Sequence, residues 1–180
     1  MLKQPYRMTA LIAQNNPAYP EGGAGPDFWS TLARYWKSGS ADDRERARVY
    51  NAPESIKAHY LHGVRDVTLI DPDNWLIDSA LMARPGWQDI SLDMLYDIRN
   101  NVPVFKAARE YFRTRQPPAL IVSGKNDEIF PGKNQEQYLG DLPHAELHLQ
   151  DSGHFALEDK APQIAALMRD FLDRTLAKGA

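Results

Sequence analysis

The chain has 180 residues with a formal net charge of −3, and 43% of them are hydrophobic, so it is long enough for one domain with a substantial core. Its Lys and Arg residues are scattered, which argues against nucleic acid or an anionic membrane as the main partner. It contains no cysteine, which excludes disulfides, thiol catalysis and thiolate metal sites and favours a cytoplasmic location.

The N-terminal residues predict a short strand that follows the end of another element. Pro5 would stop a helix arriving from upstream, and Arg7–Ala13 has the apolar character of a buried strand. This run ends before Pro17 and is far shorter than the roughly 20 apolar residues of a membrane span. Glu21–Pro26 is rich in glycine but lacks the spacing of a dinucleotide fingerprint, so we interpret it as a linker.

A long helical region separates this strand from the next one. Apolar residues recur at spacings of three and four positions after Asp27, and the sequence Asp71-Pro72-Asp73 is typical of a helix start. Pro103 opens the last helix of the region. The predicted helices cover Asp27–Trp36, Asp43–Val49, Pro53–His62, Trp75–Ala83, Ser91–Arg99 and Val104–Arg115.

The C-terminal third alternates between strands and helices. Two apolar runs of strand length, Ala119–Ser123 and Ala145–Leu149, each end in a polar turn, and a helix lies between them. The first turn carries Asp127 and the second carries His154. Helices between successive strands favour a parallel sheet, in which ligands and chemistry collect at the carboxyl ends of the strands. We therefore expect Asp127 and His154 to lie close together.

An aspartate and a histidine in these positions can form two thirds of a nucleophile–His–acid triad. The Asp127 carboxylate can accept a hydrogen bond from His154 Nδ1–H, at roughly 2.6–3.2 Å, which fixes the tautomer of the ring. A turn cap for Asp127 and a simple loop position for His154 are the alternatives. Glu128 and Asp151 compete for the acid role, but Glu128 lies further from the turn glycine and Asp151 is better placed to brace the second turn.

A second histidine grouping suggests a metal site as another hypothesis. His59 and His62 have a spacing that can place two imidazoles on one face of a helix, but no third ligand is evident. We therefore expect neither a metal nor a cofactor, and a helical metal-binding module is the least favoured function.

The third member of a triad, the nucleophile, is missing from the sequence. Neither Gly-x-Ser-x-Gly nor its aspartate variant occurs, although these patterns form the sharp strand-to-helix turn that exposes a nucleophile. A Ser-x-x-Lys motif and a His-Gly oxyanion loop before a first helix are also absent, because His62-Gly63 lies within the helical region. We expect the chain alone to hydrolyse no substrate.

The sequence resembles the C-terminal part of an α/β-hydrolase. The resemblance is specific in GKNDEIFPG, around Asp127, and in DSGHFALED, around His154, and it extends to the strand before each turn and to the final helix. The N-terminal LKQPYRMTALIAQN resembles the segment after the nucleophile helix. The helical region resembles the cap of the epoxide hydrolase and haloalkane dehalogenase relatives.

This resemblance implies an α/β fold class, as a partial α/β-hydrolase fold with three parallel strands, flanking helices and an all-helical cap insertion. Residues 1–20 and 116–180 would form the core, and residues 21–115 the cap. In that family the nucleophile and the oxyanion loop lie upstream of the point where this sequence starts. The resemblance therefore implies a fragment that is inactive alone.

By the same resemblance, Asp127 is the triad acid and His154 the general base. The nucleophile of the cap-bearing relatives is usually an aspartate, which forms an ester that a histidine-activated water hydrolyses. Tyr60 is implied to bind substrate as a pocket tyrosine, and the substrate would be a small apolar epoxide, halide or ester. A non-catalytic binding or interaction domain is the alternative. The open edge of Arg7–Ala13 would pair with the missing N-terminal half or with a second copy of the chain.

Overall fold

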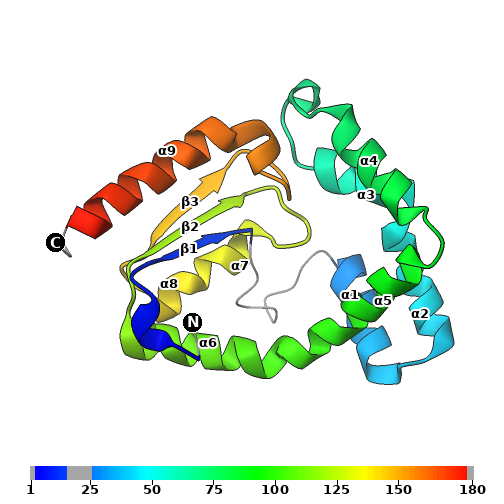
Figure 1. The fold of residues 1–180 in the computed structure, drawn as a ribbon, viewed down its shortest axis with the longest axis horizontal. Helices are drawn as coiled ribbons and strands as arrows, with labels where there is room; N and C mark the ends of the chain where they lie inside the picture. Colours follow the sequence, from blue (N-terminus) through cyan, green and yellow to red (C-terminus); the bar gives the residue numbers. More distant parts are fainter. Residues whose placement is uncertain (1–2, 16–25, 178–180) are drawn as a thin grey trace.

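Parallel strands form the sheet of this protein. The structure is a computed structural model that describes residues 3–15 and 26–177, so most of the predicted glycine-rich linker lies outside it. Within these residues, strands β1 (Leu11–Gln14), β2 (Ala119–Gly124) and β3 (Glu146–Gln150) lie side by side in the order β1-β2-β3 (Figure 1). The predicted fold class, α/β with three parallel strands and flanking helices, is confirmed.

The central strand β2 is buried on both faces, because its apolar run sends alternate side chains to each side of the sheet. One face is covered by α6 (Val102–Arg115) and α8 (Tyr138–Asp141), and the other by α9 (Leu157–Leu176), as Figure 1 shows. The short helix α7 (Gly132–Glu136) follows the turn after β2. A cluster of buried hydrophobic side chains fills each face of the sheet. The members are Ala13, Ala108, Tyr111, Phe112, Ala119, Ile121, Tyr138 and Leu142 on the first face, and Leu120, Val122, Ala156, Ile164 and Phe171 on the second.

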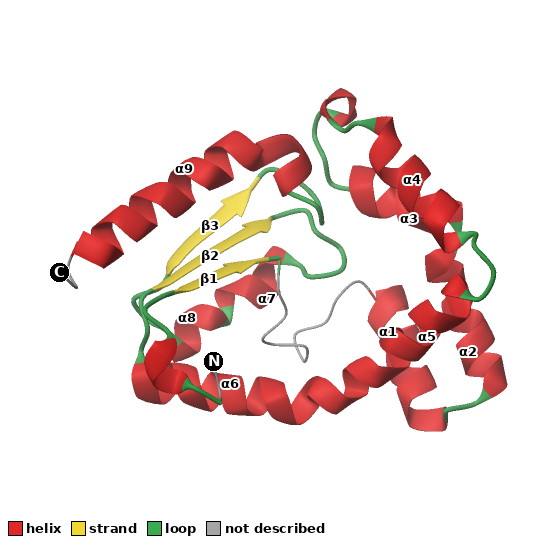
Figure 2. Cartoon of the chain, viewed as in Figure 1, coloured by secondary structure: helices red, strands yellow, loops and turns green. Residues whose placement is uncertain are grey.

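Helices α1 to α5 form a second group beside the carboxyl end of the sheet (Figure 2). Helices α1, α2 and α5 of this group share a buried cluster of Leu32, Tyr35, Ala47 and Leu92. In the described part of the chain, no helix combines the length and the apolar character needed to cross a membrane. The elements are α1 (Pro26–Ser38), α2 (Ala41–Ala47), α3 (Pro53–Leu61), α4 (Pro72–Met82) and α5 (Trp87–Asp97), with 3-10 helices η3 (Arg48–Asn51), η4 (Val67–Leu69) and η5 (Ile98–Asn101) between or after them.

The first strand is shorter than the sequence predicts. The predicted strand Arg7–Ala13 begins only at Leu11, and Pro5–Arg7 forms a 3-10 helix instead. The pairing strand starts at Ala119, because Pro118 before it has no N–H group and contributes only its carbonyl oxygen to the ladder. Without a partner strand, the apolar residues before Leu11 have no sheet to join.

Strand β1 is the edge of the sheet in the described part of the chain. It pairs with β2 along Leu11–Gln14 and with no other described strand. Its side chains are half-buried, except for the buried Ala13. The backbone N–H and C=O groups on the outer side of β1 thus pair with no described strand.

Candidate functional site

Two turns meet at the carboxyl end of the sheet. The turn after β2 contains Asn126 and Asp127, and the turn after β3 contains Ser152 and His154. The backbone N–H of Asn126 donates to Ser152 O at 3.1 Å, which ties the two turns together. Parallel pairing of β2 and β3 therefore brings both sequence-predicted residues to one place.

Glycines let these turns approach each other and the end of α3. A Cβ atom on Gly124 would overlap the carbonyl oxygen of Gly153, and one on Gly153 would overlap the carbonyl oxygen of His62. Gly63 has a φ of +79°, which favours glycine, and a Cβ there would lie 2.6 Å from Asn126 O. The end of α3 is thus packed directly against both turns.

The side chains of Asp127 and His154 are hydrogen-bonded. His154 Nδ1 lies 3.0 Å from Asp127 Oδ2, within the range expected from the sequence. Because an ionised carboxylate can only accept, Nδ1 donates in this bond, and in the neutral form of the ring the lone pair then lies on Nε2. The Asp127 side chain is fully buried, whereas 18% of the His154 side chain remains accessible. The arrangement presents the basic nitrogen of an oriented imidazole to its surroundings.

Asp127 accepts hydrogen bonds from further donors. Ile129 N–H and Phe130 N–H donate to Oδ1 at 2.7 and 2.9 Å, and Asn15 Nδ2 donates to Oδ2 at 2.8 Å. Burial alone would raise the pKa of Asp127, but the hydrogen bond and charge of His154, with the Phe130 and Asn15 donors, outweigh it and lower that pKa. Sequence reasoning missed Asn15, because no local pattern links residues 112 positions apart.

The lowered pKa of Asp127 predicts a pH-dependent stability. The folded-state pKa of Asp127 lies below the unfolded value of about 3.9. The stabilisation that ionised Asp127 gives to the folded chain is therefore present above that pH and is lost as the pH falls through the folded-state pKa. We expect the free energy of unfolding, measured by urea denaturation, to fall less on acidification in Asp127→Asn than in the wild type. Asp42→Asn, at an exposed position in α2, is the control and should keep the wild-type profile. Identical profiles for Asp127→Asn and the wild type would contradict an ionised Asp127.

The two competing carboxylates of the sequence have other partners. Glu128 Oε2 lies 3.1 Å from His62 Nδ1, in the segment that follows α3. Asp151 pairs with Lys125 Nζ at 3.0 Å and with Arg65 Nε at 2.6 Å. Hydrogen bonds from Lys125 and Arg65 hold the pKa of Asp151 far below its usual range. Asp151 therefore braces the turn, as the sequence indicates, and Glu128 is directed toward α3.

Helix α3 brings two rings to the Asp127–His154 pair. The ring centroid of His59 lies 6.2 Å from that of His154, and the Tyr60 ring lies 4.5 Å from Phe155. The Tyr60 hydroxyl donates to Asp78 Oδ2 at 2.7 Å. Burial, together with the hydrogen bond and charge of Asp78, raises the pKa of Tyr60, so its phenol stays protonated. Tyr60 is therefore near the pair, but its hydroxyl is bonded to Asp78.

His62 is the C-cap residue of α3, and its N–H donates to Ala58 O at 2.8 Å, so the helical hydrogen bonding still reaches it. The two imidazoles have different partners, however. His62 Nδ1 lies 3.1 Å from Glu128 Oε2, whereas the His59 ring centroid lies 6.2 Å from that of His154. Among residues 3–15 and 26–177, no three His, Asp or Glu side chains gather in a way that could hold a metal ion.

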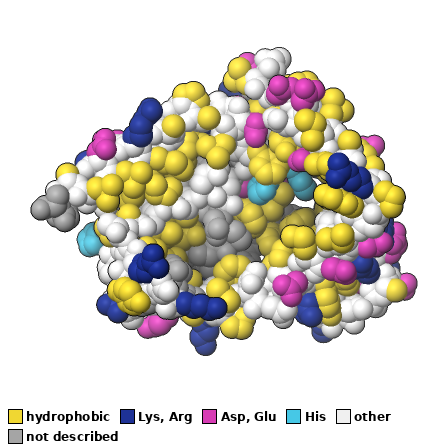
Figure 3. Space-filling view, in the orientation of Figure 1, with side chains coloured by type: hydrophobic (Ala, Val, Ile, Leu, Met, Phe, Trp, Pro, Cys, Tyr) yellow, Lys and Arg dark blue, Asp and Glu magenta, His cyan; other side chains and the backbone are white. Residues whose placement is uncertain are grey.

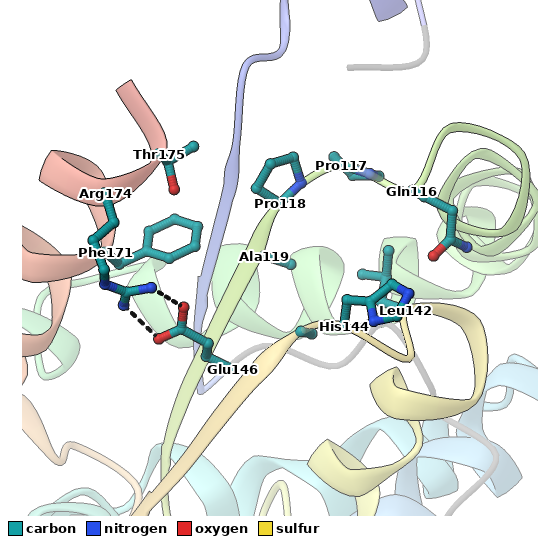
Figure 4. Close-up of a pocket in the computed structure, with 11 residues that line it drawn as sticks. Gln116, Pro117, Pro118, Ala119, Leu142, His144, Glu146, Phe171, Arg174 and Thr175 are labelled. Atoms are coloured by element: carbon teal, nitrogen blue, oxygen red, sulfur yellow. Dashed lines mark hydrogen bonds and ion pairs between the residues drawn. The ribbon is translucent and has the colours of Figure 1, made fainter. Parts of the chain in front are cut away.

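A cavity of ≈390 Å³ adjoins the pair through His59 and Phe155 and is lined mainly by aromatic and aliphatic side chains. Figure 3 shows a hollow between the sheet and helices α1 to α5, with histidine side chains at its edge among hydrophobic ones. Another cavity, of ≈310 Å³, lies at the opposite end of the sheet near Ala119 (Figure 4). There Arg174 makes two hydrogen bonds of 2.8 Å to Glu146, so the two charges neutralise each other. We place the candidate site at the first cavity.

The sequence is similar to proteins of the α/β hydrolase fold. The family model for this fold matches residues 72–161, which is half of the chain. The chain is 34% identical over 167 residues to the uncharacterized hydrolase YNR064C of Saccharomyces cerevisiae, a match that covers 91% of this chain and 57% of that protein. It is 32% identical over 59 residues to a poly(3-hydroxyalkanoate) depolymerase of Ectopseudomonas oleovorans, covering 33% of this chain and 21% of that protein.

Known structures share the fold at low sequence identity. A 2-hydroxy-6-oxo-6-phenylhexa-2,4-dienoate hydrolase from a Rhodococcus strain superposes with a TM-score of 0.69 at 16% identity, over 96% of this chain and 58% of that one. The epoxide hydrolase VrEH1 of Vigna radiata gives a TM-score of 0.61 at 14% identity, over 96% of this chain and 63% of that one. This chain thus spans a little over half the length of the yeast relative and of these structures.

Proposed function

The chain belongs to the α/β-hydrolase fold family, and from this premise we propose that Asp127 and His154 are the acid and the general base of a hydrolase active site. The observation that carries the proposal is the 3.0 Å bond between His154 Nδ1 and Asp127 Oδ2. Two turns at the carboxyl ends of neighbouring parallel strands make this bond, which is the geometry that a triad acid and base require. The accessible His154 ring supports a role as base.

The nucleophile and the oxyanion hole come from polypeptide outside these 180 residues, because the sequence contains no nucleophile elbow. The nucleophile attacks a substrate carbon, displaces a halide or opens the C–O bond of an epoxide, and forms a covalent ester. His154 Nε2 then takes a proton from a water molecule whose oxygen attacks the ester carbonyl; the ester C–O bond breaks, and the imidazolium returns the proton to the alcohol product. Asp127 stabilises the imidazolium ion formed in this step. An aspartate nucleophile, as in the epoxide hydrolase and haloalkane dehalogenase-like branch, fits this sequence of steps.

Helices α1 to α5, within residues 21–115, serve as a cap, while residues 1–20 and 116–180 belong to the hydrolase core, together with α6, which packs on one face of the sheet. The separate hydrophobic cluster of α1, α2 and α5 and the packing of the end of α3 against both turns support this division. The substrate is a small, mainly apolar compound that enters the ≈390 Å³ cavity, and Tyr60 contacts it as part of the wall. The scheme needs neither a cofactor nor a metal ion.

The edge strand β1 is where the missing part of the site attaches. Its outer backbone groups have no partner strand in the described residues, and parallel pairing there would place a new strand end beside the Asp127–His154 pair. The occupant is the nucleophile-bearing polypeptide, in the same chain or in a separate one. A homodimer through the same edge is the competing arrangement, and the oligomeric state in solution distinguishes the two.

The experiment compares the 180-residue chain with the same chain assembled with a nucleophile-bearing polypeptide encoded next to it. We expect no turnover of aryl esters, epoxides or haloalkanes by the chain alone, because the pair has nothing to activate. The assembled protein should hydrolyse at least one of these substrate classes.

Two results would overturn this function. Turnover by the chain alone that His154→Ala abolishes would show that the nucleophile lies within these residues. The absence of any adjacent coding sequence with a nucleophile elbow would favour a non-catalytic binding domain that retains the cavity.

A further inference from the structure

The ≈390 Å³ cavity beside the pair contains a single charged side chain among its described lining residues, and that side chain is Asp78 of α4. No described Lys or Arg lines it. Burial and the neighbouring His154 lower the pKa of His59, which lines the cavity as a neutral imidazole near pH 7. The electrostatic character of the cavity is therefore set by one carboxylate.

The walls of the cavity suit an aromatic or alkyl group. Tyr60 and Phe155 contact each other at 4.5 Å between ring centroids, and Phe28 and Tyr50 at 4.7 Å. Trp87 adds a third aromatic surface near the mouth, where it is 43% exposed. Aromatic faces carry negative charge density and attract cations as well as apolar groups.

Two uncharged polar residues of the lining, Ser91 and Asn51, already bond to protein partners. Ser91 Oγ donates to Asn51 Oδ1 at 2.9 Å, and Asn51 Nδ2 donates to Gln88 O at 3.4 Å. Asp78 differs, because Oδ2 accepts from Tyr60 while Oδ1 has no partner among the described residues. A ligand donor can therefore bind to Asp78 without breaking an existing bond.

Charges of both signs lie around the lining. The carboxylate of Glu158 also acts on the Tyr60 hydroxyl, in the same direction as Asp78. Arg84 lies 5.0 Å above the Trp87 ring, and Lys57 lies 5.6 Å above the Trp75 ring, but neither cation lines the cavity. A ligand carboxylate would meet like charge at Asp78 and would find no cation in the described wall.

We infer that Asp78 selects the charge of the ligand: the cavity binds an aromatic or alkyl group that carries a hydrogen-bond donor, best an ammonium, and disfavours carboxylates. Oδ1 of Asp78 receives the donor, and the rings of Tyr60, Phe155 and Trp87 contact the apolar group. The inference rests on the proposed function only in taking this ligand as the substrate. Binding itself needs no nucleophile, so it is measured separately from turnover.

The experiment titrates the 180-residue chain with benzylamine, benzyl alcohol and benzoate, which share one ring and differ in charge. Binding is followed by ligand-observed NMR and by tryptophan fluorescence at about pH 7. We expect benzylamine to bind at least about five-fold more tightly than benzoate at low salt, with benzyl alcohol between them. The ratio should shrink in roughly 0.5 M salt, because Asp78 is exposed and its charge is screened there.

Asp78→Asn should reduce the benzylamine-to-benzoate ratio to about two-fold or less by removing the charge. Tyr60→Phe should keep the preference, since it removes the competing donor but leaves the ring and the carboxylate. Asp42→Asn, an exposed change on α2, should leave all three affinities unchanged. Equal binding of benzoate by the wild type, an unaltered ratio in Asp78→Asn, or no saturable binding of any probe would each overturn the inference.

Discussion

Hydrolysis by the assembled enzyme is expected to fall by roughly 10²–10⁴-fold when His154 is replaced by alanine. The change removes Nε2, which we propose takes a proton from the attacking water. Asp127→Asn should cost a similar factor, because a neutral amide cannot stabilise the imidazolium ion and can donate to Nδ1, which reverses the tautomer. The measurement is kcat at saturating substrate, with circular dichroism confirming that each variant is folded.

The matched control for His154→Ala is His148→Ala. His148 lies on β3, its side chain is 37% exposed, and its ring nitrogen is 3.9 Å from Glu146 rather than near Asp127. Its removal should change kcat by less than about two-fold. If His154→Ala behaves like His148→Ala, the assignment of the general base is wrong.

Gly153→Ala is expected to destabilise the folded chain by about 1–3 kcal/mol. A Cβ atom at this position would overlap the carbonyl oxygen of His62, which belongs to the backbone and cannot rotate away as a side chain could. The end of α3 must then separate from the turn that carries His154. That movement would disrupt Asp127–His154 alignment as well as stability. Urea denaturation followed by circular dichroism measures the loss.

Gly140→Ala is the control for this substitution. Gly140 lies in α8, and a Cβ atom there meets nothing within 4 Å. Alanine should be neutral or stabilise the helix by about 0.5–1 kcal/mol, because it loses less backbone entropy on folding. Equal stability of Gly153→Ala and Gly140→Ala would show that α3 and the histidine turn are not in direct contact.

The sheet and the Asp127–His154 pair could be predicted because their signals are local. An apolar run such as Ala119–Ser123 can be a buried strand or part of a helix, and the polar turn with Gly124 after it favours the strand. Neighbouring parallel strands then bring the turns at their carboxyl ends together, independently of how the rest of the chain folds. The boundary of β1 was wrong by several residues, because its length depends on Pro118, which precedes a distant strand, rather than on its own sequence.

The partners of the pair could not be predicted, because they depend on contacts between distant segments. The hydrogen bond from Asn15 to Asp127 and the contact of His62 with Gly153 join residues that no sequence period relates. The same holds for the bond between Tyr60 and Asp78, which follows from the packing of α3 against α4. Sequence reasoning identified Tyr60 as a pocket residue but had no means of finding Asp78.

The most direct test of the acid–base assignment uses mass spectrometry of the assembled protein carrying His154→Gln. Without the base, the ester formed with substrate should persist, so the protein should gain the mass of one substrate-derived group. We predict that the modified peptide lies outside these 180 residues and that wild-type protein shows no lasting adduct. A persistent adduct on a residue of this chain, or full turnover by His154→Gln, would contradict the account.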